Sequence, residues 1–223
     1  MFEAVLWDFG GVILTSPFEA FNRYESDRGL PADFIRRVNA TDPHTNAWAR
    51  LERSDIDAKE FDLAFADESA TLGHRVSGAD VLALLSGEVR GEMVTALDRV
   101  GGAGFRTACL TNNVIGEHSS TERADTIAAV MQRFYVVVES SKIGVRKPEP
   151  KFYEIACEML RVEPAACVFL DDLGINLKPA AAMGMHTIKV LDPTQAITEL
   201  ELALGIALRR PGSEWRAPMA SSV

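Results

Sequence analysis

Short apolar runs alternate with segments of helical period through most of the chain. The apolar runs are bounded by glycine or polar residues, which is typical of buried strands, and they lie at residues 4–7, 105–111, 135–139, 167–171 and 186–191. The segments of helical period lie at residues 91–102, 119–134, 150–160, 177–183 and 194–204. Strands that alternate with helices indicate a parallel sheet with helices on both faces.

The stretch between the first and second predicted strands has no strand pattern. Its helical segments lie at residues 16–29, 31–38, 46–53 and 57–73. Ser16 and Asp57 each precede a helical segment and are followed three residues later by glutamate, which predicts helix N-caps at both positions. We therefore expect a core of residues 1–15 and 91–208, an inserted helical cap of residues 16–90, and a tail of residues 209–223 without periodicity.

Composition narrows the classes of function. The net charge of −9 argues against a nucleic-acid-binding surface, which needs clustered Lys and Arg. No apolar run approaches the ~18 residues of a membrane span, and no basic segment precedes an apolar one at the N-terminus. Cys109, Cys157 and Cys167 are widely spaced, without metal-ligand spacing, which is typical of reduced thiols in a cytoplasmic protein.

Chemically active side chains follow the predicted strands. Asp8 ends the first strand and is followed by two glycines, and Thr111 and Asn112 end the second. In an open α/β sheet, ligands bind at this edge. A hydroxyl and backbone N–H groups at a strand end can hold phosphate oxygens.

Two further loops complete the set. Lys147 is followed by a proline, and the adjacent carboxylates Asp171 and Asp172 end the fourth strand. Paired carboxylates are costly to hold together unless a cation neutralises them, and carboxylate oxygens with water suit Mg²⁺. Each residue also has a structural interpretation: a turn for Asp8 or Thr111, a solvated lysine, or a helix cap for the Asp pair. Together they supply a nucleophile, a hydroxyl, a cation and a metal site, which are the parts of phosphoryl transfer.

In the order of these motifs, from about Phe2 to Leu204, the sequence resembles the haloacid dehalogenase superfamily of hydrolases. The runs FLDDLGINLKPAAAMGM and GVRKPEP are similar to the phosphatase-like N-terminal domain of soluble epoxide hydrolase and its bacterial relatives. The resemblance implies an α/β fold: a Rossmann-like three-layer core with a five-stranded parallel sheet, plus an inserted α-helical cap over the site.

The resemblance also implies a metal site. Asp8 would attack phosphorus and form an aspartyl-phosphate. Mg²⁺ would be held by Asp8, the backbone carbonyl of Gly10 and Asp172, with Asp171 supporting the site and Asn176 lying behind it.

The remaining residues would handle the substrate. Thr111 and the N–H of Asn112 would hold the phosphate, and Lys147 would offset charge on the nucleophile and the phosphoryl oxygens. The expected partner is a small-molecule phosphate ester, and relatives that form dimers suggest a homodimer.

Gly10 departs from the family pattern. Phosphatases of the superfamily usually carry an Asp there that protonates the leaving group, and such a group contributes roughly 10²–10⁴-fold in rate. Three outcomes are open: a substrate with a good leaving group such as an anomeric sugar phosphate, a proton from another residue such as His44 or His74, or a weakly catalytic phosphate-ester-binding or regulatory domain.

Two further alternatives remain. A metal-free haloacid dehalogenase also lacks the second Asp, but the Asp171–Asp172 pair would repel an anionic haloacid. Trp48 and Phe61 would either line the substrate pocket or belong to the core of the cap.

Overall fold

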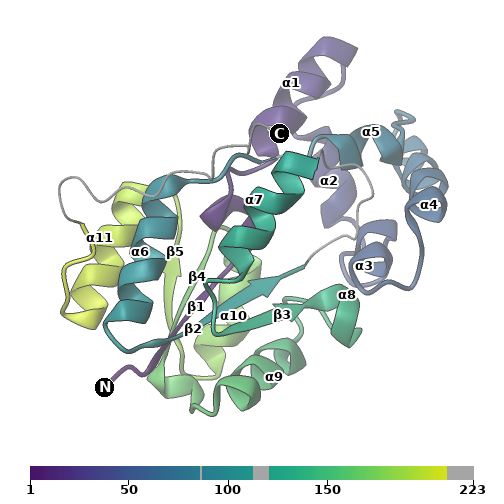
Figure 1. Ribbon diagram of the computed structural model, residues 1–223. Coiled ribbons are helices and arrows are strands. Elements are labelled where there is room, and N and C mark those ends of the chain that lie inside the picture. Colours follow the sequence, from purple (N-terminus) through teal and green to yellow (C-terminus); the bar gives the residue numbers. More distant parts are fainter. Residues whose placement is uncertain (86, 113–120, 210–223) are drawn as a thin grey trace.

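The computed structural model describes residues 1–85, 87–112 and 121–209. The predicted tail beyond Arg209 and the first two residues of the predicted helix 119–134 lie outside the described residues. Five parallel strands form one sheet in the order β3-β2-β1-β4-β5 (Figure 1). The strands are β1 (Ala4–Trp7), β2 (Arg106–Thr111), β3 (Val136–Glu139), β4 (Cys167–Asp171) and β5 (His186–Lys189). The predicted α/β fold class is confirmed.

Helices cover both faces of the sheet, so the core has three layers (Figure 1). One face packs against α6 (Gly91–Gly102), α7 (Thr121–Met131) and α11 (Pro193–Leu204), and the other against α9 (Pro150–Leu160) and α10 (Gly174–Ala182). Successive strand residues point to opposite faces, so Val5 and Trp7 enter one apolar cluster while Ala4 and Leu6 enter the other. Burial on both faces explains why these strands read as continuous apolar runs.

Of the described α-helices between β1 and β2, α6 packs on the sheet, and the other five form a separate layer, which we call the cap. They are α1 (Phe18–Arg28), α2 (Phe34–Ala40), α3 (Ala47–Glu52), α4 (Ala58–Thr71) and α5 (Gly78–Ala83). The cap has its own apolar cluster, built around fully buried aromatic side chains such as Phe34, Phe61 and Phe65. Burial of one such side chain contributes roughly 1.5–3 kcal/mol, so this cluster is a main source of stability within the cap.

The two predicted N-caps have different outcomes. The Asp57 side chain accepts from the N–H groups of Lys59 and Glu60, and the Glu60 side chain accepts from the Asp57 N–H, which confirms a capping box. The prediction for Ser16 is wrong, because Pro17 takes the N-cap position of α1 without a side-chain bond. The backbone just before α1 is held by a distant segment, because the Thr15 N–H donates to the Glu88 carbonyl at 2.8 Å.

Several short elements carry no sequence signal long enough to predict. They are α5, α8 (Ser140–Ile143), the 3₁₀ turn η2 (Pro164–Ala166) and the single π-helical turn η1 (Phe9–Ile13) after β1. Within η1, Gly11 has φ +80°, in the left-handed region that favours glycine. None of the described helices has both the length and the apolar character that crossing a membrane requires.

Candidate active site

The ends of the three central strands bring the predicted residues to one edge of the sheet. Trp7 pairs with Leu170, and the Asp8 N–H donates to the Leu170 carbonyl at 2.8 Å. Thr111 and Asp171 are the last residues of the strands on either side of β1. Asp8 therefore lies between them, at the carboxyl edge where α/β sheets bind ligands.

Lys147 lies at the centre of the site. Its Nζ is 2.7 Å from Asp8 Oδ1 and 2.7 Å from Asp171 Oδ2, and the residue is 1% exposed. Burial lowers the pKa of Lys147, but the charges of Asp171 and Asp8 outweigh burial and raise the pKa above its ordinary value. The lysine is therefore a fixed positive charge rather than a solvated surface group.

The Asp171 carboxylate is fully occupied by protein donors. Oδ1 accepts from the Leu173 N–H at 2.8 Å, Oδ2 accepts from Lys147, and Asn176 Nδ2 is 3.1 Å from each oxygen. Tyr153 in turn donates to the Asn176 carbonyl at 2.6 Å. The Leu173 N–H and the Asn176 amide thus hold the Asp171 carboxylate in place, and this carboxylate in turn holds the Lys147 ammonium.

Asp8 is held by one oxygen only. Its Oδ1 accepts from the Phe9 N–H at 2.6 Å and pairs with Lys147, while Oδ2 has neither a hydrogen bond nor an ion pair among the described residues. Burial raises the pKa of Asp8 well above its ordinary value, Lys147 lowers it, and the charges of Asp171 and Asp172 raise it further. The arrangement leaves one carboxylate oxygen available to react.

Asp172 lies beside Asp8 without an ion pair in the described part of the chain. Its carboxylate packs on Gly11, where a Cβ would lie 2.2 Å from Asp172 Oδ2. Burial and then the charge of Asp171 raise the pKa of Asp172 to about 6, against the smaller lowering effects of the Lys147 charge and, last, the Arg90 charge. A side chain at position 11 would therefore displace this carboxylate.

The donor set fits a divalent cation. One oxygen each from Asp8, Asp171 and Asp172 lies within 4.8 Å of the others. These three carboxylates face a single ammonium, so the cluster carries an excess of negative charge that a divalent cation would neutralise. Carboxylate oxygens are hard ligands of the kind Mg²⁺ prefers. Because Asp171 is already filled, Asp8 and Asp172 are the ligands best suited to a metal.

Thr111 and Asn112 follow each other at the end of β2, and Asn112 contacts Lys147. Thr111 is buried at the end of β2. The Asn112 side chain is bonded to the Lys147 peptide, with Nδ2 donating to the Lys147 carbonyl at 2.9 Å and Oδ1 accepting from the Lys147 N–H at 2.8 Å. The Asn112 side chain is therefore already engaged by the protein.

Two residues of this neighbourhood were missed by the sequence analysis. Glu52 of the cap accepts from Asn112 Nδ2 at 3.2 Å, and its Oε2 is 2.5 Å from Arg146 Nε. Glu52 and Arg146 are far apart in the sequence, and each sits in an ordinary polar context. No local pattern distinguishes this pair from solvated charges.

The other residues considered from sequence have clear positions. Gly10 has φ −73°, and a Cβ there would meet nothing within 4 Å, so the site has room for a side chain at this position. His44 and His74 are exposed, and His74 packs edge-on against Phe34 in the cap.

Trp48 and Phe61 belong to the cap. Phe61 is fully buried there, and its ring centroid is 5.3 Å from that of Trp48. Trp48 Nε1 donates to Glu52 Oε1 at 2.9 Å.

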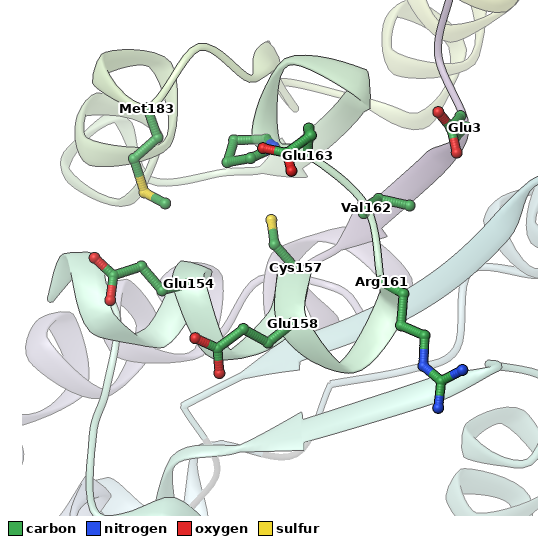
Figure 2. A pocket seen from close by; sticks show the side chains of 9 residues that line it. Glu3, Glu154, Cys157, Glu158, Arg161, Val162, Glu163 and Met183 are labelled. Carbon is green, nitrogen blue, oxygen red and sulfur yellow. The ribbon is translucent and has the colours of Figure 1, made fainter.

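A separate pocket of about 480 Å³ lies at the opposite edge of the sheet, beside the start of β1 (Figure 2). Figure 2 shows Glu154, Cys157 and Glu158 along α9, with Met183 and Glu163 across the pocket. Glu3 adds a fourth carboxylate, against the single cation of Arg161. This charge is unfavourable for an anionic ligand, and the lining of this pocket has no counterpart of the buried Lys147 at the strand ends.

Comparison with known proteins places this geometry in a family. Residues 2–184 match the model of the haloacid dehalogenase-like hydrolases. The chain belongs to this family of hydrolases. Two mouse proteins are similar: "Acyl-CoA dehydrogenase family member 10", 34% identical over 93% of this chain, and "Bifunctional epoxide hydrolase 2", 31% identical over 89%. The chain spans 20% of the first and 38% of the second, well under half the length of either relative.

Solved structures of haloacid dehalogenase-like enzymes share the fold. One from Bacteroides thetaiotaomicron, in complex with magnesium and inorganic phosphate, has a TM-score of 0.56 and 18% identity over 85% of this chain and 94% of that chain. The L-2-haloacid dehalogenase of Xanthobacter autotrophicus, with chloropropionic acid covalently bound, has a TM-score of 0.57 and 18% identity over 97% and 93%. The family resemblance seen in the sequence is confirmed, and the chain is a hydrolase of this fold.

Proposed function

We propose that this hydrolase cleaves small phosphate monoesters in the cytoplasm, through an aspartyl-phosphate on Asp8 and with the aid of Mg²⁺. The observation that carries the proposal is the buried Lys147, 2.7 Å from both Asp8 and Asp171, beside Asp172, which has no ion pair with any described residue. The three buried cysteines, which form no disulfide, suit a reducing compartment.

The reaction begins with an oxygen of Asp8 attacking phosphorus as the bond to the ester oxygen breaks. Lys147 holds Asp8 in place and offsets charge on the phosphoryl oxygens, while Thr111 and the Asn112 N–H orient the phosphate. Water then cleaves the aspartyl-phosphate, which releases inorganic phosphate and restores the Asp8 carboxylate.

Asp8, Asp172 and the Gly10 carbonyl would hold Mg²⁺, with Asp171 and Asn176 fixing the loop behind them. When bound, the ion neutralises the excess negative charge of the carboxylates and of the phosphate. The protein's own groups bond to both oxygens of Asp171, so Asp172 is the carboxylate that remains to bind the ion.

Gly10 shapes the choice of substrate. In the absence of an acid at this position, the ester oxygen must leave with little protonation, which favours good leaving groups such as that of an anomeric sugar phosphate. The exposed His44 and His74 make no contact with the site among the described residues, which weakens their case as proton donors.

A second candidate follows from the same glycine: a domain that binds phosphate esters and turns them over poorly. A dehalogenase is the less favoured reading, because the Asp172 carboxylate beside Asp8 would repel an anionic haloacid unless a cation were bound.

The test is phosphate release from a panel of monoesters that includes sugar 1-phosphates, with and without Mg²⁺, for the wild type and for Asp8→Asn. We expect Mg²⁺-dependent release that falls by at least about 10³-fold in the variant, since the nucleophile is lost. Halide release from 2-haloacids is assayed in parallel.

Saturable ester binding by calorimetry without release would favour the binding domain. Release of halide instead of phosphate would favour the dehalogenase. Undiminished release by a folded Asp8→Asn would remove Asp8 from the mechanism.

A further inference from the structure

Glu52 is the point where the cap reaches the site. It is the last residue of α3 and is 6% exposed. Its Oε1 accepts from Trp48 Nε1 within the cap, and its Oε2 faces the core, where it meets Asn112 Nδ2 at 3.2 Å and Arg146 Nε at 2.5 Å. A buried carboxylate with three partners, two of them on another layer, is a specific connection between cap and core.

Both core partners of Glu52 are attached to Lys147. Asn112 forms a two-bond contact with the Lys147 peptide, at 2.9 Å and 2.8 Å. Arg146 precedes Lys147 in the chain, and its Nη1 donates to the Pro43 carbonyl of the cap at 2.8 Å. The backbone that carries the site's only described buried lysine is thus held on one side by Asn112 and on the other by Arg146.

The charges at this junction suit an anionic substrate. Burial raises the pKa of Glu52, and the charge of Arg146 lowers it. Because Arg146 offsets the Glu52 charge, the pair adds no net negative charge beside the place where a phosphate would bind. A carboxylate whose oxygens are already engaged is also poorly placed to donate a proton, so Glu52 does not replace the acid missing at Gly10.

We propose that Glu52 is a positioning residue that couples the cap to the placement of Lys147, acting through Asn112 and Arg146. The inference rests on the proposed function, in which Lys147 stabilises the phosphoryl oxygens. Glu52 orders the Asn112 amide and the Arg146 guanidinium, and these fix the Lys147 peptide.

The kinetic test compares Glu52→Gln with the matched control Glu149→Gln. Glu149 pairs with Arg53 of the cap at 3.5 Å, so the control removes another charge of the same cap–core junction without a contact to Asn112. We expect Glu52→Gln to lower kcat by about 10- to 100-fold, as losses of orienting partners do, with a much smaller change in KM. The control is expected to keep the wild-type kcat.

A second measurement does not depend on turnover. The Lys147 N–H donates to Asn112 Oδ1, so its amide hydrogen exchange reports on the contact directly. We expect exchange at Lys147 to be faster in Glu52→Gln than in the wild type and unchanged in Glu149→Gln.

The two readouts separate the two proposals. If the wild type releases no phosphate from any ester but Lys147 exchange responds to Glu52→Gln, the coupling stands and the proposed reaction fails. Equal exchange at Lys147 in the wild type and Glu52→Gln would overturn the coupling. An equal loss of kcat in Glu52→Gln and Glu149→Gln would also overturn it, since the effect would then be a general loss of cap docking.

Discussion

The cap and the core both bury carboxylates, but they satisfy them in different ways. In the cap, Glu25 is 2% exposed, and its two oxygens accept the N–H groups of Asp33 and Ile35 at 2.8 Å each, at the start of α2. In the core, Asp8 and Asp171 share one ammonium, that of Lys147. Glu25 caps the N-terminus of α2, whereas two of the core carboxylates pair with the same cation.

The difference separates a structural charge from a reactive one. Backbone N–H groups fix Glu25 and use both of its oxygens, so nothing remains for a ligand. Among the core carboxylates, Asp171 is similarly engaged, while Asp8 Oδ2 and Asp172 have no ion-pair partner in the part of the chain that the structure describes. Burial alone therefore does not distinguish these carboxylates; what differs is whether their oxygens are already bonded to protein groups.

Removal of the Lys147 ammonium, which Asp8 and Asp171 share, is expected to have the largest effect. Lys147→Met leaves Asp8 and Asp171 buried without their partner, which we expect to destabilise the protein by about 3–5 kcal/mol at neutral pH and to abolish turnover. The measurement is denaturant unfolding at several pH values.

The pH dependence serves as the control. In Lys147→Met the pKa of Asp8, already raised by burial, loses its main lowering influence. A carboxyl whose pKa is higher in the folded state binds more protons when folded, so its unfavourable effect grows as pH rises through that pKa. The destabilisation should thus be larger at pH 8 than at pH 5, and a pH-independent loss would point to packing instead.

Adding a carboxylate to the core sharpens the comparison in the opposite direction. Gly10→Asp places an acid where a Cβ meets nothing within 4 Å and where φ is −73°, so the backbone accepts it without strain. For esters with poor leaving groups we expect a gain in kcat of roughly 10²-fold, the lower range for an added general acid. Gly10→Asn is the matched control in steady-state assays, and a gain shared by both variants would exclude acid catalysis.

The smallest effect is expected in the cap. Glu25→Gln keeps one acceptor but turns an amide N–H toward a backbone N–H of α2, which leaves a buried donor unsatisfied. We expect a loss of about 1–3 kcal/mol in unfolding free energy with kcat unchanged. Thermal unfolding and phosphate release measure the two quantities, and a loss of kcat in the folded variant would mean that the cap charge also serves the site.

The sequence predicts the core well for a simple physical reason. Strands buried on both faces are continuous apolar runs, and parallel strands deliver their last residues to one edge, so Asp8, Thr111 and Asp171 can be placed together before any coordinates are known. The sequence could not assign the partners of these residues. That Asp171 is filled by Lys147 and Asn176, while Asp172 lies against Gly11, depends on side-chain directions within one loop.

Contacts between the cap and the core are harder still to predict from the sequence. Glu52 looked like one more polar residue at the end of a short helix, and its partners Asn112 and Arg146 come from two distant loops. The prediction of Ser16 as the N-cap of α1 was wrong for a related reason. The backbone direction at Ser16 is set by the hydrogen bond between Thr15 and Glu88. Such features are decided by how layers dock, and no local pattern encodes them.

The order of strands in the sheet limits how the site could be transferred to another protein. Asp8 follows β1 and Asp171 ends β4, two strands that are neighbours in the sheet but about 160 residues apart in the sequence. No fragment that omits either strand retains the cluster, and the cap and β2 lie between them. A gene fusion or a domain transplant can therefore pass on this chemistry only as an undivided module, in keeping with the nearly full-length match to larger relatives.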